Sequence, residues 1–173
     1  SIPIVTIGAS ATAMYYVALK MVRNEESYIA KSFFRSFKQN FRQSTIVWVV
    51  MLLAGILLVA DFLILAQMDA SYVQFIRYGL LIITLIYGMI MVYIFPLLAK
   101  FYNTLKNTVK NSLLMSIRHL PMTLLMLVIS FAPMIITLSF VQAFVYGSVI
   151  WILVGFALTA YLSSRFLVKI FDK

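Results

Sequence analysis

The stretch that decides the fold is Ser44–Leu65, STIVWVVMLLAGILLVADFLIL, whose single charged residue is Asp61. A helix of this length is about 33 Å long, enough to cross the roughly 30 Å hydrocarbon core of a bilayer. It is preceded by KSFFRSFKQNFR (Lys31–Arg42), which mixes phenylalanines with cations. The sequence therefore predicts a transmembrane helix with a basic, aromatic segment at the membrane surface just before it.

The composition agrees with a membrane protein. Hydrophobic residues make up 64 % of the chain and charged residues 11 %, whereas soluble domains average roughly 45–50 % and about 25 %. The excess apolar surface must face lipid or a large partner. The chain has no cysteine and one histidine, which excludes disulfides, thiolate metal sites and histidine pairs. The net charge of +9 is spread between apolar runs, which indicates membrane topology rather than nucleic-acid binding.

The apolar runs predict one all-α domain over residues 1–173, a polytopic transmembrane helix bundle with about five membrane helices and cytoplasmic amphipathic helices. The expected elements are a short membrane helix 7–22, an amphipathic helix 26–43, transmembrane helices 44–65, 78–99, 121–141 and 145–164, and a second amphipathic helix 100–118. Segment 7–22 is short for a crossing, so a re-entrant or interfacial helix is the alternative. Its abrupt apolar start predicts a further membrane helix upstream.

The amphipathic segments supply the candidate site residues. At about 100° per residue, the phenylalanines of 26–43 share one arc and its cations a neighbouring arc. Either the aromatics face lipid and the cations face head groups, or the phenylalanine stripe packs on the bundle. The candidate membrane-surface or partner-binding residues are Lys31, Phe33, Phe34, Arg35, Phe37, Lys38, Phe41, Arg42, Lys106, Lys110 and Arg118.

A faint internal repeat links these two segments. Residues 36–44 (SFKQNFRQS) match residues 104–112 (TLKNTVKNS) in chemical type at nearly every position. Parallel repeats of this kind occur in transporters. Two basic interfacial helices would also resemble each other without any common origin, so both interpretations stay open.

The distribution of charge predicts which loops lie on which side of the membrane. Residues 20–42 hold six Lys or Arg against two Glu, and residues 100–118 hold four cations and no acid, whereas residues 61–77 hold one Arg against two Asp. Because cationic loops stay cytoplasmic, we expect a multi-pass plasma-membrane protein. Both amphipathic helices and the C-terminus should face the cytoplasm.

The sequence contains no recognisable catalytic or metal-binding motif. The five acids are scattered, and none forms a metal-binding HExxH, a P-loop or a carboxylate pair on one helix face. Asp61 is the one acid within an apolar run, and it reads either as an interfacial residue or as a functional carboxylate. We therefore expect no catalytic, cofactor-binding or metal-binding residues, no cofactor and no enzyme activity.

The N-terminal features occur in a specific order: PIVTIGAS (Pro3–Ser10), AMYY (Ala13–Tyr16), KMVRNEE (Lys20–Glu26) and SFFRSFKQNF (Ser32–Phe41). This order resembles the YesL-like family of bacterial membrane proteins, most densely over residues 2–45. The resemblance implies an additional helix before the first one and no known catalytic residues. Family members often lie beside genes for ABC-type carbohydrate uptake, which implies a role in that transport. Positions that match the family pattern and are expected to be structural or partner-facing are Gly8, Tyr15, Tyr16, Phe37 and Asn40.

Three functions follow as hypotheses. The first is an accessory or scaffold component of carbohydrate ABC-type transport, and the resemblance favours it. The second is a small oligomeric permease, which the repeat would suit. The third is a protein that organises the membrane surface or its lipids through the cations of 26–43. The expected partners are the lipid bilayer, ABC transporter subunits and a second copy of the chain, with no nucleic acid.

Overall fold

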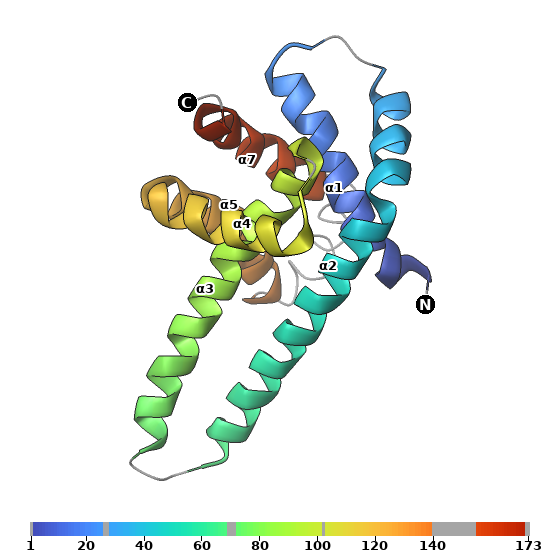
Figure 1. Cartoon of the computed structure of the whole chain (residues 1–173). Helices are drawn as coiled ribbons and strands as arrows, with labels where there is room; N and C mark the ends of the chain where they lie inside the picture. The colour runs from blue at the N-terminus through green and yellow to red at the C-terminus, as the bar shows by residue number, and fades with distance from the viewer. Residues whose placement is uncertain (1, 26–27, 69–71, 102, 140–154, 172–173) are drawn as a thin grey trace.

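The computed structural model describes residues 2–25, 28–68, 72–101, 103–139 and 155–171. Within these residues all regular secondary structure is helical, as predicted. The helices are α1 (Ile2–Val22), α2 (Ile29–Ala66), α3 (Val73–Lys100), α4 (Leu105–Arg118), α5 (Leu120–Ser139) and α7 (Phe156–Phe171). Helices α2 and α3 form a long antiparallel arm that projects from a cluster made by α1, α4, α5, α7 and the adjoining parts of α2 and α3 (Figure 1).

The predicted segments 26–43 and 44–65 form one continuous helix rather than two separate ones. Helix α2 has 38 residues, which corresponds to about 57 Å, nearly twice the bilayer core. Its first glycine is Gly55 and it contains no proline, so nothing in the backbone interrupts it where the composition changes at Ser44. The predicted boundary is a change of surroundings and not a break in the helix.

Helix α1 begins at Ile2, earlier than the predicted residue 7, and packs antiparallel on the first half of α2 (Figure 1). The Thr12 and Ser44 hydroxyls lie 2.8 Å apart, and Gly8 lies against Ser44 and Trp48. Ala9 and Ala13 are fully buried, so α1 packs through its small residues. Along α2, therefore, α1 reaches only the start of the predicted 44–65 crossing.

The count of five membrane helices is not supported. Among the described residues, α2 and α3 are long and apolar enough to cross a membrane. Helix α4 and the first part of α5 would add a third span if they count as one, although they are bent by 106°. Segment 7–22 corresponds to α1, beside the basic half of α2, and the first half of segment 145–164 lies outside the described residues.

The core is organised around the second half of α3. Every residue from Val92 to Ala99 is buried. Tyr93 and its neighbours pack with α1, α5 and α7, while Ile94 and Phe95 pack with α2. Pro96 lies within this stretch, and α3 nevertheless continues to Lys100. A proline in the last turns removes one backbone hydrogen bond without ending the helix.

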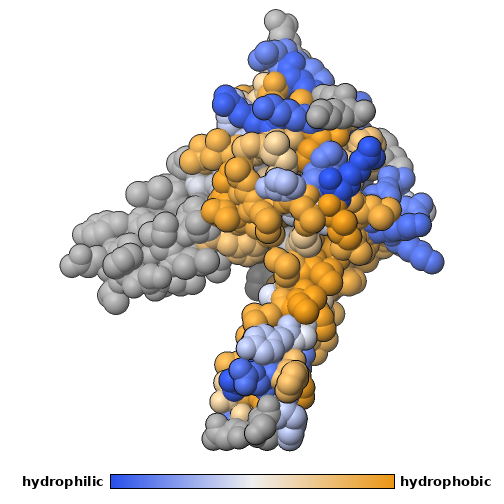
Figure 2. Space-filling model, turned by 90° about the vertical axis from the view of Figure 1, so that its left-hand side faces the viewer, coloured by the Kyte–Doolittle hydropathy of each residue, from blue (hydrophilic) through white to orange (hydrophobic). Residues whose placement is uncertain are grey.

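Hydropathy changes along the long axis of the molecule. Hydrophilic residues gather at the end where α1 stops and α2 begins, and again near the tip of the arm, with a hydrophobic zone between them (Figure 2). The exposed apolar side chains of the arm include Leu53, Leu57, Ile82 and Ile83. Apolar surface of this extent on two adjacent helices indicates contact with lipid.

Candidate membrane and partner surfaces

The first half of α2 contacts the bundle through small polar residues. Ser36, Asn40 and Ser44 recur every four residues and are all buried. The Asn40 Nδ2 donates to the Ser36 carbonyl at 3.2 Å. The Thr12 hydroxyl donates to the Gly8 carbonyl at 3.0 Å, which leaves Ser44 to donate to Thr12. Small hydroxyl residues allow close approach of two helices and satisfy each other inside apolar surroundings.

The predicted phenylalanine stripe lies beside this contact rather than in it. The rings of Phe33 and Phe37 stack with centroids 6.2 Å apart, and Phe37 and Phe41 follow at 5.4 Å. Phe34 packs edge-on against Phe33 at 5.6 Å and is 68 % exposed. The rings therefore form a ladder along α2 in which Phe33 and Phe37 are half-buried and Phe34 and Phe41 are exposed.

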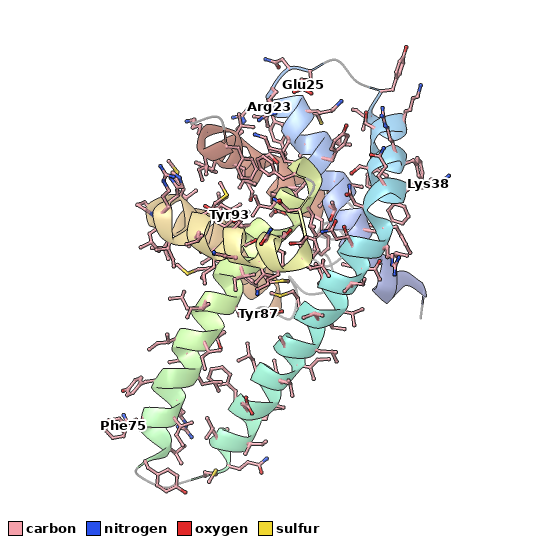
Figure 3. The ribbon with its side chains drawn as sticks, viewed as in Figure 1. Arg23, Glu25, Lys38, Phe75, Tyr87 and Tyr93 are labelled. Carbon is pink, nitrogen blue, oxygen red and sulfur yellow. The ribbon has the colours of Figure 1, made fainter. Side chains whose placement is uncertain are left out.

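The predicted cations flank this ladder on the outer side of the helix. Lys31, Arg35, Lys38 and Arg42 are all exposed, and Lys38 points away from the rest of the molecule (Figure 3). None of the four forms an ion pair within the described residues. We call the four phenylalanines and these four cations the aromatic-basic face.

The turn that leads into α2 is built around Asn24. Asn24 has φ 55°, and the amide of Glu25 donates to the Lys20 carbonyl at 3.1 Å, the pattern of a left-handed helix C-cap. The carboxylate of Glu25 reaches Lys20 and Arg23 at 4.0 and 3.9 Å, and Figure 3 shows Arg23 and Glu25 together at this end of the molecule. Both ion pairs are partly exposed, so they orient the turn more than they stabilise it.

The remaining predicted cations lie on α4. Lys106, Lys110 and Arg118 are exposed, while Thr108, Ser112 and Ser116 are buried. Equivalent positions are buried in the two copies of the repeat, which are 68 residues apart in the sequence. Asn40 and Ser44 correspond to Thr108 and Ser112, and all four are buried. Lys38 and Arg42 correspond likewise to the exposed Lys106 and Lys110. The repeated segment therefore shares its burial pattern as well as its chemical types.

Helix α4 turns sharply into α5, and a hydroxyl cluster satisfies the broken backbone there. The Thr123 hydroxyl lies 2.9 Å from the Ser116 carbonyl and 3.0 Å from the His119 carbonyl. The Tyr93 hydroxyl from α3 lies 3.0 Å from the Thr123 hydroxyl. Figure 3 shows Tyr93 at the centre of the helix cluster. The contact between Tyr93 and Thr123 therefore connects the bend between α4 and α5 to the core of the molecule.

Two contacts hold the arm together. The Tyr87 hydroxyl donates to the Met51 carbonyl at 2.9 Å, and Tyr87 lies between α2 and α3 in Figure 3. Nearer the tip, the Arg77 guanidinium donates to the Leu65 carbonyl at 2.7 Å, which caps the end of α2. Asp61 is exposed on α2, a position that does not favour the functional interpretation of this carboxylate.

Two apolar grooves lie beside these contacts. One, of about 530 Å³, lies between α1, α2 and α7 and is lined by Met14, Val17, Ala18, Met21, Ile29, Ala30, Phe33, Ala157 and Tyr161. The other, of about 440 Å³, lies between α2 and α3 beneath Tyr87 and Gly55. Within the described residues no group of acids and histidine could hold a metal ion.

In the buried polar stripes on α2 and α4, the family resemblance pointed only to Asn40. The sequence interpretation missed the others, which are Ser36, Ser44, Thr108, Ser112 and Ser116. Apolar periodicity offered the phenylalanine stripe as a possible packing face of residues 26–43, whereas the structure buries Asn40 there and Thr108 on α4. The signal was the spacing of small polar residues at four-residue intervals in both copies of the repeat.

Comparison with known proteins supports the resemblance inferred from the N-terminal motifs. Residues 1–62 match the model of a family described as a protein of unknown function, DUF624. The chain is 29 % identical over 118 residues to the uncharacterized protein YesL of Bacillus subtilis, covering 68 % of this chain. It is 27 % identical over 124 residues to the uncharacterized protein YteU of the same organism, covering 71 %. In each case the match spans 55 % of the relative. No solved structure matches the chain.

Proposed function

Starting from its resemblance to the YesL-like family of unknown function, we propose that this chain is a non-catalytic membrane scaffold, an accessory component of carbohydrate ABC-type transport. The single observation that supports a scaffold is the continuity of α2. One helix joins an apolar segment long enough to cross the bilayer to the aromatic-basic face. The transport assignment rests on the resemblance alone.

The geometry of α2 suits a protein that presents a surface to a partner. The bundle holds the first half of α2 through Ser36, Asn40 and Ser44, so the adjoining phenylalanine ladder is fixed in direction. Phe34, Phe41 and the cations remain exposed. Exposed aromatics with surrounding cations are typical of residues that anchor interfaces. The aromatic-basic face is therefore the docking surface in this proposal.

The proposal places this face in the cytoplasm and the tip of the arm outside the plasma membrane. Six cations in residues 20–42 and four in residues 100–118 support this orientation, against one in residues 61–77. In this arrangement the docking surface would meet the cytoplasmic side of a transporter.

The test is affinity purification of the tagged full-length protein from its native membrane in mild detergent. We expect an ABC permease subunit to co-purify in stoichiometric amount. The double variant Phe34→Ala, Phe41→Ala should recover at least about tenfold less of it, the effect of roughly 1.4 kcal/mol. Phe75→Ala is the matched control, because Phe75 is 80 % exposed and points outward near the tip of the arm (Figure 3).

Two results would contradict the proposal. If the protein is recovered alone, or only with further copies of itself, it is not an accessory subunit. If Phe75→Ala lowers recovery of the permease as much as the double variant does, the docking surface is not the aromatic-basic face.

A further inference from the structure

A third groove lies between α2 and α4, and it differs from the other two in being charged. Its volume is about 840 Å³, within the range of roughly 300–1,000 Å³ of ligand-binding clefts. The α2 wall is made by Ile46, Val47, Val50 and Met51, with Ile94 of α3 contributing. The α4 wall carries Leu105, Lys106, Asn107, Val109, Lys110 and Leu113.

The two lysines give the groove a positive side. Lys106 and Lys110 are four residues apart on α4, so they lie on one face of the helix, one turn apart. Both are exposed, and neither forms an ion pair with an acid in the described parts of the chain. Among the residues that the structure describes, no acid lines the groove. The charge that would complement it is an anion from outside the protein.

The apolar side of the groove continues into the lipid-facing surface of α2. Ile46 and Val50 are 42 % and 58 % exposed, and they lie just after Ser44, where the apolar stretch of the sequence begins. At the polar end, the Gln43 side-chain amide donates to the Asn103 carbonyl at 2.6 Å and links α2 to the residues before α4. An occupant would therefore need an anionic group for the lysines and an apolar body for the α2 wall.

We propose that this groove is a binding site for an anionic phospholipid of the bilayer. The phosphate lies between Lys106 and Lys110, and one acyl chain lies along Ile46, Val50 and Val109. Charge complementarity selects an anionic over a zwitterionic lipid, and continuity with the apolar arm selects a lipid over a soluble phosphate. The site is separate from the aromatic-basic face and does not depend on the proposed scaffold function.

The experiment is native mass spectrometry of the detergent-purified full chain after incubation with phosphatidylglycerol, with phosphatidylcholine as the comparison lipid. We expect one phosphatidylglycerol to be retained in preference. Removing both charges in Lys106→Gln, Lys110→Gln should weaken retention by roughly 30-fold. The matched control is Lys31→Gln, Lys38→Gln, which removes the same charge from α2 outside the groove and should retain the lipid.

A second variant tests the apolar half of the site. Val109→Trp fills the groove and leaves both lysines in place, so it should also lose the lipid while its circular dichroism spectrum stays helical. Equal retention of the two lipids, or equal losses in both lysine double variants, would overturn the proposal. Retention by Val109→Trp, or equally tight binding of glycerol 3-phosphate, would show that only a phosphate is held and would overturn the lipid assignment.

Discussion

Gly8 is the residue on which the contact between α1 and α2 depends most directly. A Cβ atom at this position would lie 2.5 Å from the Ser44 carbonyl oxygen and 2.5 Å from the Trp48 Cβ. Both neighbours are held by the α2 backbone and cannot rotate away. The close approach also brings Thr12 within hydrogen-bond distance of Ser44.

We therefore predict that Gly8→Ala separates α1 from α2 and destabilises the protein by about 1–3 kcal/mol, the usual cost of overpacking. Thermal unfolding in detergent measures the change. Gly79→Ala is the control, because no atom lies within 4 Å of its added Cβ, and alanine should be neutral or stabilising by up to about 1 kcal/mol there. An unchanged melting temperature in Gly8→Ala would show that α1 does not pack as described.

The sequence predicted the importance of Gly8 but not of its partner Ser44. Gly8 was singled out by the family resemblance. Ser44 was taken as the polar start of a span, because hydropathy patterns assign packing to apolar residues. Small hydroxyl residues can also form a helix contact, because they let two helices approach closely and can hydrogen-bond to each other, as Thr12 and Ser44 do.

At the level of the elements, the least expected feature is the length of α2. The sequence changes from charged and aromatic to apolar at Ser44, and the prediction placed an element boundary there. Helix formation depends on the backbone and on intrinsic propensity, and no glycine or proline lies between Ile29 and Ala54. The change of composition at Ser44 marks where the surroundings of the helix change. It does not mark where the helix ends.

The continuity of α2 can be measured as a distance. The natural sequence has no cysteine, so Lys31→Cys, Leu57→Cys gives a uniquely spin-labelled pair, and both positions are exposed. A straight helix separates positions 31 and 57 by about 39 Å. Pulsed electron spin resonance should show one narrow distribution near that value. As a control, labels at Leu57 and Ile83 should report the separation of α2 and α3 within the arm, and it should be shorter. A broad distribution of shorter distances between the labels at positions 31 and 57 would mean that the helix bends or breaks at Ser44.

For the whole molecule, the sequence predicted the all-helical class and the apolar arm, but not how the helices are arranged. Lipid-facing residues can be recognised from composition, because the bilayer acts uniformly on any apolar helix. The packing of α1 beside the basic half of α2, and the 106° turn between α4 and α5, depend on specific pairs such as Thr12 with Ser44 and Tyr93 with Thr123. Such pairs are distant in sequence, and no local pattern encodes them.

The direction of the arm across the membrane is the last prediction, and it applies to the molecule as a whole. Lys38 on α2 and Asn103 after α3 lie at the basic end, whereas Gln67 lies at the tip of the arm, and all three are exposed. A membrane-impermeant maleimide should label Gln67→Cys in intact cells. It should label Lys38→Cys and Asn103→Cys only after permeabilisation, because the proposed orientation, based on the cations near these positions, places them in the cytoplasm. The cysteine-free parent protein measures background labelling. Labelling of all three in intact cells would show that the α2–α3 arm does not cross the bilayer, and the inverse pattern would place the aromatic-basic face outside, beyond the reach of any cytoplasmic partner.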